Sequence, residues 1–364
     1  MKIGIMTFPN STSFGASLQM YALYRAVERL DVQAEIINYH NAYMKAERHT
    51  SAMQGNKKLK KIRLWAKHML HFGQIQKFRR FERSMPCYPK RPICQKQKLR
   101  QLSDRYDGVI CGSDQVWNPN ITDTDMSFFL DFCGENTKRI SYAPSFGITE
   151  FTEEFQNSIQ KELHTFHALS VRETEGQQLL HRLMQKQVPV VLDPTFLLDK
   201  GDWTALEKPH AAAKEGYILY YTVRSSKSLL RFCLDLADKT HKKVVIVGGN
   251  FLRQLGNRDK RICYARDIGP EQWLYLMHHA QYVVTNSFHG TAFAIHYQKD
   301  FFLEYSSTTN SRLQQIIGAA KLENRVVGPN VASWDEKIDY TWVESSLEHI
   351  KTQSVSYLKE AIGQ

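Results

Sequence analysis

The sequence lacks several patterns that would assign a cofactor or a membrane position directly. Its six cysteines are scattered and none forms a Cys-x-x-Cys pair, so we expect reduced thiols and no zinc site. No apolar run approaches the roughly 20 residues that a membrane-spanning helix needs. Neither G-x-x-x-x-G-K-[ST] nor the complete G-x-G-x-x-G spacing occurs, which argues against a P-loop NTPase and a dinucleotide site. No metal-ligand cluster is evident, and we expect no metal.

Acidic residues are scarce in one part of the chain. Over 364 residues, 48 Lys and Arg exceed 37 Asp and Glu, which gives a net charge of +11. Residues 41–100 hold 17 of these cations against two acids, Glu47 and Glu82, so this segment carries +15 and the remainder about −4. The excess of positive charge therefore belongs to one segment and not to the whole protein.

Within this segment, residues 57–72 have the pattern of a basic amphipathic helix. A solvated helix face is the first interpretation, and contact with anionic lipid headgroups is the second. Nucleic-acid binding comes last, because no recognised nucleic-acid fold accompanies the charge, and we expect no nucleic-acid partner. Met1–Phe8 has the pattern of a strand and not of a signal peptide, so we expect a cytoplasmic protein. Under the second interpretation of residues 57–72, this segment would meet the inner membrane face.

The order of strand and helix signals predicts an α/β protein. A strand over Lys2–Thr7, a helix over about 17–30 and a strand over Glu35–Tyr39 form a βαβ opening, which implies a parallel sheet. Further short apolar runs end in polar or Gly/Pro loops; they are residues 107–111, 139–143, 168–171 and 189–192. Several candidate site loops are therefore expected along one edge of one sheet.

A polar stretch without periodicity, residues 199–216, predicts a domain boundary. The predicted parts are an N-terminal α/β domain over 1–205 with a basic helical segment at about 45–100, a C-terminal α/β domain over 206–340, and a C-terminal helix over 341–364. That helix would begin with a capping box formed by Thr341 and Glu344. The simplest architecture is two Rossmann-like doubly wound domains facing a cleft. This is similar to the GT-B arrangement, in which the last helix often crosses back to the first domain.

The most informative segment is Tyr282–Ile295, where an apolar β-branched run passes through a short polar loop into a helical pattern. The start of a helix presents N–H groups and a partial positive charge, which suit a phosphate. His289 could hold a phosphate oxygen or act as a general acid, and a ring packed under the loop is the alternative. Ser287, Phe288 and Gly290 are expected to donate backbone N–H groups to the same phosphate, with Gly290 letting the backbone approach the ligand.

Six segments together resemble the polysaccharide pyruvyl transferase family, and they occur in the family's order. They are Phe14–Leu23, Val109–Asn118, Ile140–Gly147, Leu169–Glu173, Val191–Thr195 and Thr285–Gly290. The resemblance implies a GT-B-like fold and transfer of a pyruvyl group from phosphoenolpyruvate (PEP) to hydroxyls of a glycan or glycan precursor. The product would be a pyruvate ketal on a cell-envelope or exopolysaccharide glycan. PEP would be the donor substrate, and no cofactor is implied.

Ketal formation requires groups that hold two anions, an acid that protonates PEP and a base that accepts a hydroxyl proton. Arg172, in the family's Ser-x-Arg match, is expected to grip PEP through two parallel hydrogen bonds. Its alternative is to cap a loop or to pair with Glu173 or Glu175. Asp114 is equally a candidate general base and an Asx-turn residue.

Other candidates are assigned to the acceptor or to a site loop, and they are Gly15, Gln19, Gln115, Asn118 and Arg312. Gly15 and Gln19 belong to a first loop that resembles a phosphate-approach turn, whereas Gln115 and Asn118 suit sugar hydroxyls. Trp117 is either a core residue or a platform for a sugar. Arg312 either reaches the site or forms a salt bridge on its helix. For Asp193, before Pro194, a turn is favoured.

We expect PEP between the Arg172 and His289 loops, with domain closure completing the site. Two alternatives stay open: a GT-B nucleotide-sugar glycosyltransferase, and a non-catalytic relative that binds a glycan or polyanion. A lipid-linked, nucleotide-linked or polymeric acceptor would each be compatible with the sequence.

Overall fold

The computed structural model describes residues 1–41, 72–214, 216–248, 259–305 and 311–363. The chain divides into two compact units. Unit 1 is Met1–Leu198 with Ile350–Gln364, and unit 2 is Asp199–His349. The first unit thus ends at Leu198, before the predicted limit of 205, and it includes the C-terminal residues. The predicted basic helix over 57–72 lies outside the described residues.

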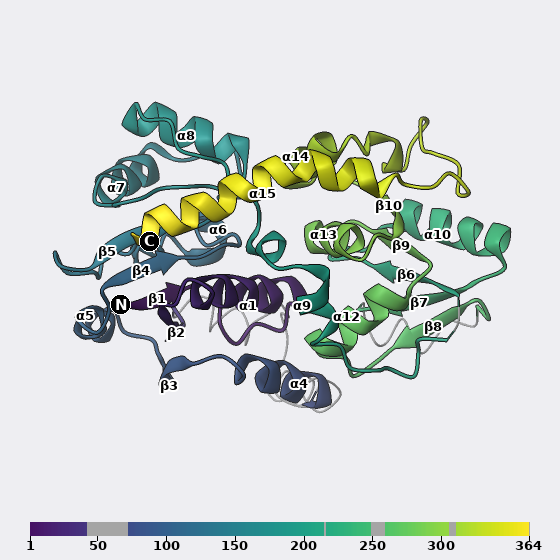
Figure 1. Ribbon diagram of the computed structural model, residues 1–364, viewed down its shortest axis with the longest axis horizontal. Coiled ribbons are helices and arrows are strands. Elements are labelled where there is room, and N and C mark those ends of the chain that lie inside the picture. The colour runs from purple at the N-terminus through teal and green to yellow at the C-terminus, as the bar shows by residue number, and fades with distance from the viewer. Residues whose placement is uncertain (42–71, 215, 249–258, 306–310, 364) are drawn as a thin grey trace, which may run out of the picture. The chain divides into compact units, whose positions relative to one another are not determined.

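Unit 1 is built on a five-stranded sheet of order β3-β2-β1-β4-β5, in which every pair of neighbours is parallel (Figure 1). The strands are β1 (Lys2–Met6), β2 (Gln33–Tyr39), β3 (Cys87–Ile93), β4 (Gly108–Cys111) and β5 (Lys138–Ser141). β4 is buried throughout its length, which explains its continuous apolar sequence. The βαβ opening and the parallel sheet agree with the prediction.

The helices of unit 1 follow capping signals that the sequence carries. Ser13 caps α1 (Phe14–Glu28) through its side chain, and Thr152 caps α7 (Glu153–Leu163) in the same way. The other helices are α4 (Phe72–Glu82), α5 (Lys96–Ser103), α6 (Pro119–Thr122) and α8 (Thr174–Met184), with 3-10 turns η1 (Met126–Phe129) and η2 (Pro194–Leu197). Trp117 and Phe129 stack in the core with ring centroids 4.9 Å apart.

Two predicted strands of unit 1 are wrong. Residues 168–171 and 189–192 form only isolated bridges, Ile140 with Ala168 and Val171 with Val190. Pro189 has no N–H to donate, so a continuous ladder cannot pass through it. Segment 168–171 lies beside β5, and segment 189–192 lies beside segment 168–171. Together they bring Arg172 and Asp193 to the carboxyl edge of the sheet.

Unit 2 contains a second parallel five-stranded sheet, of order β10-β9-β6-β7-β8. Its strands are β6 (Tyr217–Tyr221), β7 (Lys243–Val247), β8 (Ile262–Ala265), β9 (Tyr282–Thr285) and β10 (Asp300–Leu303). Its helices are α9 (Lys200–Thr204), α10 (Lys227–Thr240), α12 (Pro270–His279), α13 (Phe288–His296) and α14 (Ser311–Ala320), with a 3-10 turn η3 (Glu323–Arg325). Trp203 and Trp273, both fully buried, pack edge-on against Phe293.

The last helix, α15 (Tyr340–Ile362), ends in unit 1. Ser354 accepts a hydrogen bond from the Leu192 amide at 2.9 Å, and the Tyr357 hydroxyl donates to the Ser141 carbonyl at 2.8 Å. The predicted capping box is wrong, because Asp339 accepts from the amides of Thr341 and Trp342. The helix therefore begins one residue earlier than predicted.

Each sheet has one point where the direction of winding reverses, and ligands of such folds bind beyond the carboxyl ends of the strands at that point. In unit 1 the reversal lies between β1 and β4, and in unit 2 it lies between β6 and β9. The loops that follow these four strands are therefore the first places to look for a site. In the described part of the chain, no helix has both the length and the apolar composition needed to cross a membrane.

Candidate functional site

The candidate site residues of unit 1 gather into a buried cluster of Ser113, Asp114, Arg172 and Asp193, which we call the Arg172 cluster. Arg172 is 3% exposed, and its Nη1 donates to Asp193 Oδ2 at 2.7 Å and to Ser113 Oγ at 3.3 Å. Its Nη2 lies 3.8 Å from Asp114 Oδ1. The positive charge of Arg172 is thus balanced within the protein, which is what burial of a guanidinium requires.

These contacts correct the partners expected for Arg172. Glu173 does not pair with it: the Glu173 carboxylate instead accepts from the Ser145 hydroxyl and the Phe146 amide, each at 2.9 Å. Asp193, expected to serve a turn, does cap η2 through the Thr195 amide, but it is also the ion-pair partner of Arg172. The signal in the sequence was that Asp193 directly follows a buried apolar run. The sequence analysis did not predict that Asp193 pairs with Arg172.

Asp114 is the member of the cluster that is accessible to solvent. Its side chain is 19% exposed, and its backbone adopts φ 81°, a conformation that is costly for a residue other than glycine. Backbone pairing holds this loop in place, because Asp114 forms a bridge with Pro144 and accepts from the Ser145 amide at 2.8 Å. Oδ1 also accepts from the Gln115 amide at 2.9 Å. Asp114 therefore forms a turn and presents a carboxylate at the same time.

Three of the remaining candidates of unit 1 are structural. Gln19 is fully buried and its Nε2 donates to Thr7 Oγ1 at 3.0 Å and to the Ala16 carbonyl at 3.1 Å. Gly15 is buried in the first turn of α1. Trp117 is fully buried and donates its indole N–H to the Phe128 carbonyl, so it is a core residue and not a sugar platform. Burial excludes direct contact between a saccharide and the side chains of Gln19 and Trp117.

Gln115 and Asn118 form a hydrogen-bonded pair beside Asp114. Asn118 Nδ2 donates to Gln115 Oε1 at 2.8 Å, and Asn118 caps α6 through the Asn120 amide. Asn118 is only 4% exposed, whereas Gln115 is half-buried. Of the two amides predicted to meet sugar hydroxyls, the structure leaves Gln115 as the one with an accessible surface.

The candidate residues of unit 2 form the His289 loop, residues 285–290, between β9 and α13. Ser287 caps α13, and its Oγ accepts from the Gly290 amide at 3.2 Å. Thr285 Oγ1 accepts from the Ser287 amide at 3.1 Å. Two of the predicted phosphate donors, Ser287 N–H and Gly290 N–H, thus already have acceptors within the protein. The third predicted donor, the Phe288 amide, belongs to the first turn of α13.

Gly290 has a packing role that the sequence analysis did not assign. A Cβ at this position would lie 2.3 Å from Thr285 Oγ1 and 3.1 Å from Tyr221 Cδ1. The missing side chain therefore permits α13 to pack closely against β9 and β6.

His289 and Arg312 both lie near the Phe288 ring of the His289 loop. His289 is 9% exposed, and its ring lies edge-on to Phe288 with centroids 5.2 Å apart. The guanidinium carbon of Arg312, on α14, lies 5.9 Å from the centroid of the Phe288 ring. A cation, an imidazole and the positive end of a nine-residue helix thus share one region.

Asn286 was named within the motif but given no role, and the structure supplies one. Its Oδ1 accepts from the Val223 amide at 3.0 Å and its Nδ2 donates to the Arg224 carbonyl at 2.8 Å. The side chain therefore joins the loop after β6 to the loop after β9, across the reversal point of the sheet. An amide side chain directly after a buried strand was the available signal.

A possible metal-ligand group of unit 2 lies elsewhere. Glu207, His278 and His279 have ligand atoms within 4.8 Å of one another, although no such cluster was expected from the sequence. The His278 Nδ1 lies 2.9 Å from Glu207 Oε1, and the His279 Nδ1 lies 2.9 Å from the Tyr275 carbonyl. Burial lowers the pKa of His278 despite the adjacent Glu207. The group lies at the end of α12, just before β9 begins, at the sheet edge opposite the His289 loop.

By fold, the chain is similar to UDP-N-acetylglucosamine 2-epimerases. It aligns with a putative enzyme of this kind from Listeria monocytogenes at TM-score 0.53 and 9% identity, over 99% of this chain and 91% of that one. It aligns with the enzyme from Methanocaldococcus jannaschii, in complex with UDP-GlcNAc and UDP, at TM-score 0.50 and 13% identity, over 96% and 93%. At such identities the likeness shows the fold alone, and it confirms the predicted GT-B-like class.

The sequence identifies the family more specifically. A model of the polysaccharide pyruvyl transferase family matches residues 14–307, a range that contains all six motif segments, and the chain belongs to this family. Membership indicates a transferase that moves a pyruvyl group to a polysaccharide and therefore has a saccharide acceptor. No curated protein sequence matches the chain.

Proposed function

We propose that the protein transfers the pyruvyl group of PEP to two hydroxyls of a saccharide and forms a cyclic ketal. Family membership supports the transfer, and one structural observation carries the choice of donor. His289 lies at the start of α13, at the reversal point of the unit 2 sheet, and the Arg312 guanidinium on α14 lies near the neighbouring Phe288 ring; a phosphate is favoured at such a helix start.

The proposed reaction balances without a redox step. The methylene carbon of PEP gains a proton and becomes a methyl group, while the first hydroxyl oxygen bonds to C2 and loses its proton. The second hydroxyl oxygen then bonds to C2, and the bond from C2 to the phosphate oxygen breaks. The proton of the second hydroxyl leaves with the phosphate. PEP and a diol thus give a ketal and inorganic phosphate.

In unit 2, the His289 loop is assigned to the donor. The amides of Phe288 and His289, the His289 ring and the Arg312 guanidinium would stabilise the charge that builds up on the departing phosphate. His289 is proposed to supply a proton as well as a hydrogen bond, since a positioned imidazole ring can act as a general acid.

In unit 1, Asp114 is assigned the proton of the acceptor hydroxyl, and Gln115 a contact with the saccharide. Arg172 was expected to clamp PEP, but its Nη1 bond to Asp193 favours another role. Removing one partner of a buried ion pair costs about 3–5 kcal/mol, so a substrate would have to compete with a strong contact. We therefore propose Arg172 as a positioning residue that holds Asp114 and Asp193.

Calorimetric titration with PEP tests the donor assignment. We expect His289→Ala to lose PEP binding and turnover, and His289→Asn to retain binding but lose at least about 100-fold in kcat, because an amide bonds but does not transfer a proton. The exposed His279→Ala serves as the matched control. Binding of UDP-GlcNAc with no response to PEP would instead support a glycosyltransferase, and full activity of His289→Ala would remove His289 from the mechanism.

Arg172→Lys and Asp193→Asn together decide the role of Arg172. If Arg172 positions the cluster, both variants should lower the free energy of unfolding and kcat, with little change in the Kd for PEP. A large rise in the Kd for PEP in Arg172→Lys alone would restore the clamp. Unfolding in urea, measured alongside, separates loss of structure from loss of binding.

A further inference from the structure

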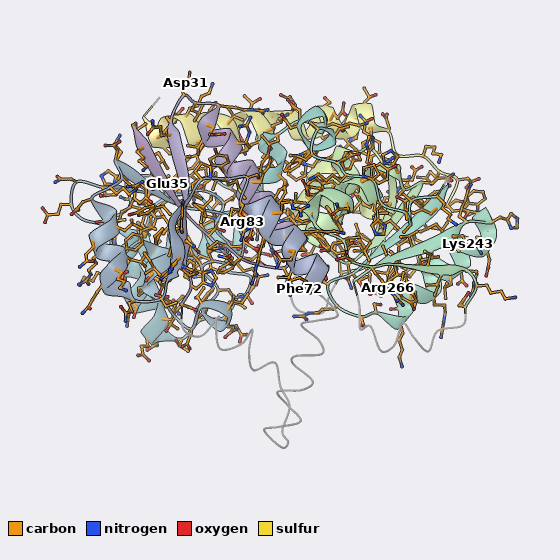
Figure 2. The ribbon with its side chains drawn as sticks, turned by 90° about the horizontal axis from the view of Figure 1, so that it is seen from below. Asp31, Glu35, Phe72, Arg83, Lys243 and Arg266 are labelled. Atoms are coloured by element: carbon orange, nitrogen blue, oxygen red, sulfur yellow. The ribbon has the colours of Figure 1, made fainter. Side chains whose placement is uncertain are left out.

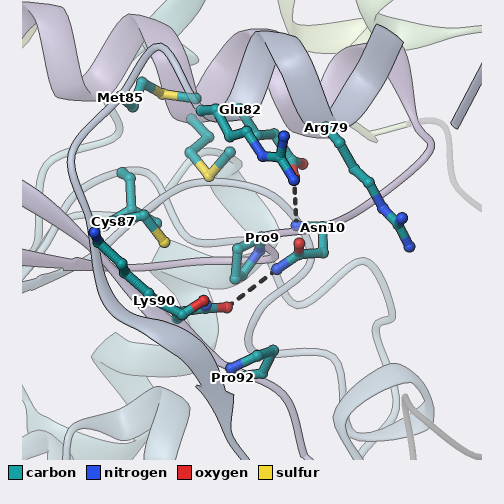
Figure 3. Close-up of a pocket in the computed structure, with 12 residues that line it drawn as sticks. Pro9, Asn10, Arg79, Glu82, Met85, Cys87, Lys90 and Pro92 are labelled. Carbon is teal, nitrogen blue, oxygen red and sulfur yellow. Dashed lines mark hydrogen bonds between the residues drawn. The ribbon is translucent and has the colours of Figure 1, made fainter. Parts of the chain in front are cut away.

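Unit 1 contains a pocket of about 700 Å³ that the Arg172 cluster does not use (Figure 3). It lies at the carboxyl edge of the sheet, beside the loop after β1 and against α4 and β3. Its volume falls within the range of small-molecule sites, roughly 300–1,000 Å³. None of the candidate residues from the sequence lines it.

Three cationic side chains line this pocket, Arg79, Arg83 and Lys90, and all are exposed. Arg83 continues the last turn of α4, since its amide bonds to the Arg79 carbonyl, so the two guanidinium groups lie on one helix face. Figure 2 places Arg83 at the end of α4 opposite Phe72. Within the described parts of the chain, none of the three cations forms an ion pair.

Some arginines elsewhere in the described residues do have carboxylate partners. Arg105, Arg139 and Arg261 each pair with a carboxylate within 3.1 Å. The pocket has a carboxylate of its own, Glu82, which accepts from the Asn10 amide at 3.0 Å. Three cations against one carboxylate leave a local charge of +2, which an anion would neutralise.

The wall of the pocket is built from a fixed amide network. Asn10 has φ 56°, and its Nδ2 donates to Asn38 Oδ1 at 3.1 Å and lies 2.8 Å from His40 Nε2. The Asn38 Nδ2 donates in turn to the Pro89 carbonyl at 2.9 Å. A left-handed backbone that is locked by its neighbours in this way is typical of ligand sites. Figure 3 shows Asn10 between α4 and the strand that carries Lys90.

Behind the cations the pocket is closed by Met20, Ile36 and Met85, whose side chains are at most 3% exposed. The apolar surface that a ligand could meet comes from the half-buried Cys87 and the exposed Pro92. Burial, with Glu82 and Glu35 nearby, raises the pKa of Cys87 to about 12, so this thiol is protonated at neutral pH and is not a nucleophile. The pocket is thus suited to bind a ligand and not to react with it.

We propose that this pocket binds a phosphate or diphosphate ester of an uncharged organic group. The phosphate would contact Arg79 and Arg83, and the organic group would lie against Cys87, Pro92 and the aliphatic stem of Lys90. PEP has no uncharged organic group of a size that could cover this surface. The proposal concerns binding in unit 1 and does not depend on pyruvyl transfer.

Two probes distinguish the sources of such a group: UDP for nucleotides and geranyl diphosphate for prenyl carriers. Binding to the full chain is measured by calorimetry at low salt, with inorganic phosphate as the reference. We expect one probe to bind more tightly than phosphate, and the double variant Arg79→Gln, Arg83→Gln to weaken it by about tenfold or more, as expected for lost charged hydrogen bonds.

The chain offers matched controls. Arg80 on α4 and Arg91 on β3 are exposed neighbours that do not line the pocket, and Arg80→Gln with Arg91→Gln should leave binding unchanged. Glu82→Gln should tighten binding, because it removes the opposing charge and keeps an acceptor for the Asn10 amide. His289→Ala should have no effect on either probe, even where it abolishes PEP binding.

Three results would overturn the proposal. The first is an equal loss of probe binding in the control variants, which would indicate non-specific attraction. The second is that neither probe binds more tightly than phosphate, and the third is a loss of PEP binding in the Arg79 and Arg83 variants. The last result would place the donor in this pocket and would also contradict the role given to the His289 loop.

Discussion

At the scale of single residues, packing partners fix the positions of Gly290 and Arg172. Gly290 was expected to admit a ligand, and Thr285 and Tyr221 leave no room for a Cβ at its position. Arg172 was expected to bind an anion from solution, and it binds Asp193. Asp193 belongs to another motif and Tyr221 lies in β6, so spacing along the chain does not reveal that these groups are neighbours.

Gly290→Ala is expected to lower the free energy of unfolding of unit 2 by about 1–3 kcal/mol, because the new methyl group would overlap Thr285 Oγ1 and separate α13 from β9. Gly201→Ala is the matched control: it lies in α9 with nothing within 4 Å of a Cβ, and should be neutral or stabilising. Thermal unfolding of both variants measures the difference. Equal stability would show that the helix can shift without cost.

At the scale of elements, one buried carboxylate connects several strands of unit 1. Glu35 on β2 is labelled in Figure 2. It accepts from the Tyr106 hydroxyl at 2.7 Å and pairs with Arg105 and Lys2. Lys2 lies on β1, and Tyr106 precedes β4, so the carboxylate joins the three central segments of the sheet. Burial raises the pKa of Glu35, but the hydrogen bonds from Arg105, Tyr106 and Lys2 outweigh it and lower the pKa overall.

A lowered pKa in the folded state means that Glu35 stabilises unit 1 above its ordinary pKa, and that this contribution disappears as the pH falls through the folded value. We expect Glu35→Gln to cost about 1–2 kcal/mol at neutral pH, with the difference from the parent closing in acid. Urea unfolding across this pH range measures it. Glu135→Gln is the matched control in unit 1, because this exposed carboxylate has no ion pair among the described residues. A constant gap for Glu35→Gln would contradict the charge-based account.

At the scale of the whole molecule, the two ends of the chain belong to the same unit. Residues 350–364 join unit 1 through Ser354 and Tyr357, and Leu358 and Ile362 of α15 are buried. The apolar spacing of the C-terminal helix indicated that it must cover a surface. Only the fold identifies that surface as the one beside β5 and the segment ending at Leu192.

Leu358→Ala is expected to destabilise unit 1 by about 2–5 kcal/mol, the usual cost of a cavity at a leucine that is 2% exposed. Its exposed neighbour Lys359→Ala should have little effect. Hydrogen exchange can report the amides of Val109 in β4 and Val283 in β9 separately. Faster exchange at Val109 than at Val283 is expected, and equal acceleration at both would mean that the units unfold together.

The sequence by itself determined the α/β class, most strand and helix positions, the six motif segments and thus the family. These features depend on local periodicity, on capping residues such as Ser13 and Thr152, and on matches of residue type, all of which are local in the chain. Segments 168–171 and 189–192 failed as strands because a strand exists only where its neighbours can pair with it.

Only the tertiary structure decided which residues share a site. It joined Arg172 to Asp193, moved Gln19 and Trp117 into the core, and brought Arg312 to Phe288. It also formed the pocket of Arg79, Arg83 and Lys90 from a basic segment for which the sequence left a solvated face and a lipid contact open. Contacts and burial depend on how distant segments pack, and composition and spacing along the chain do not specify that packing.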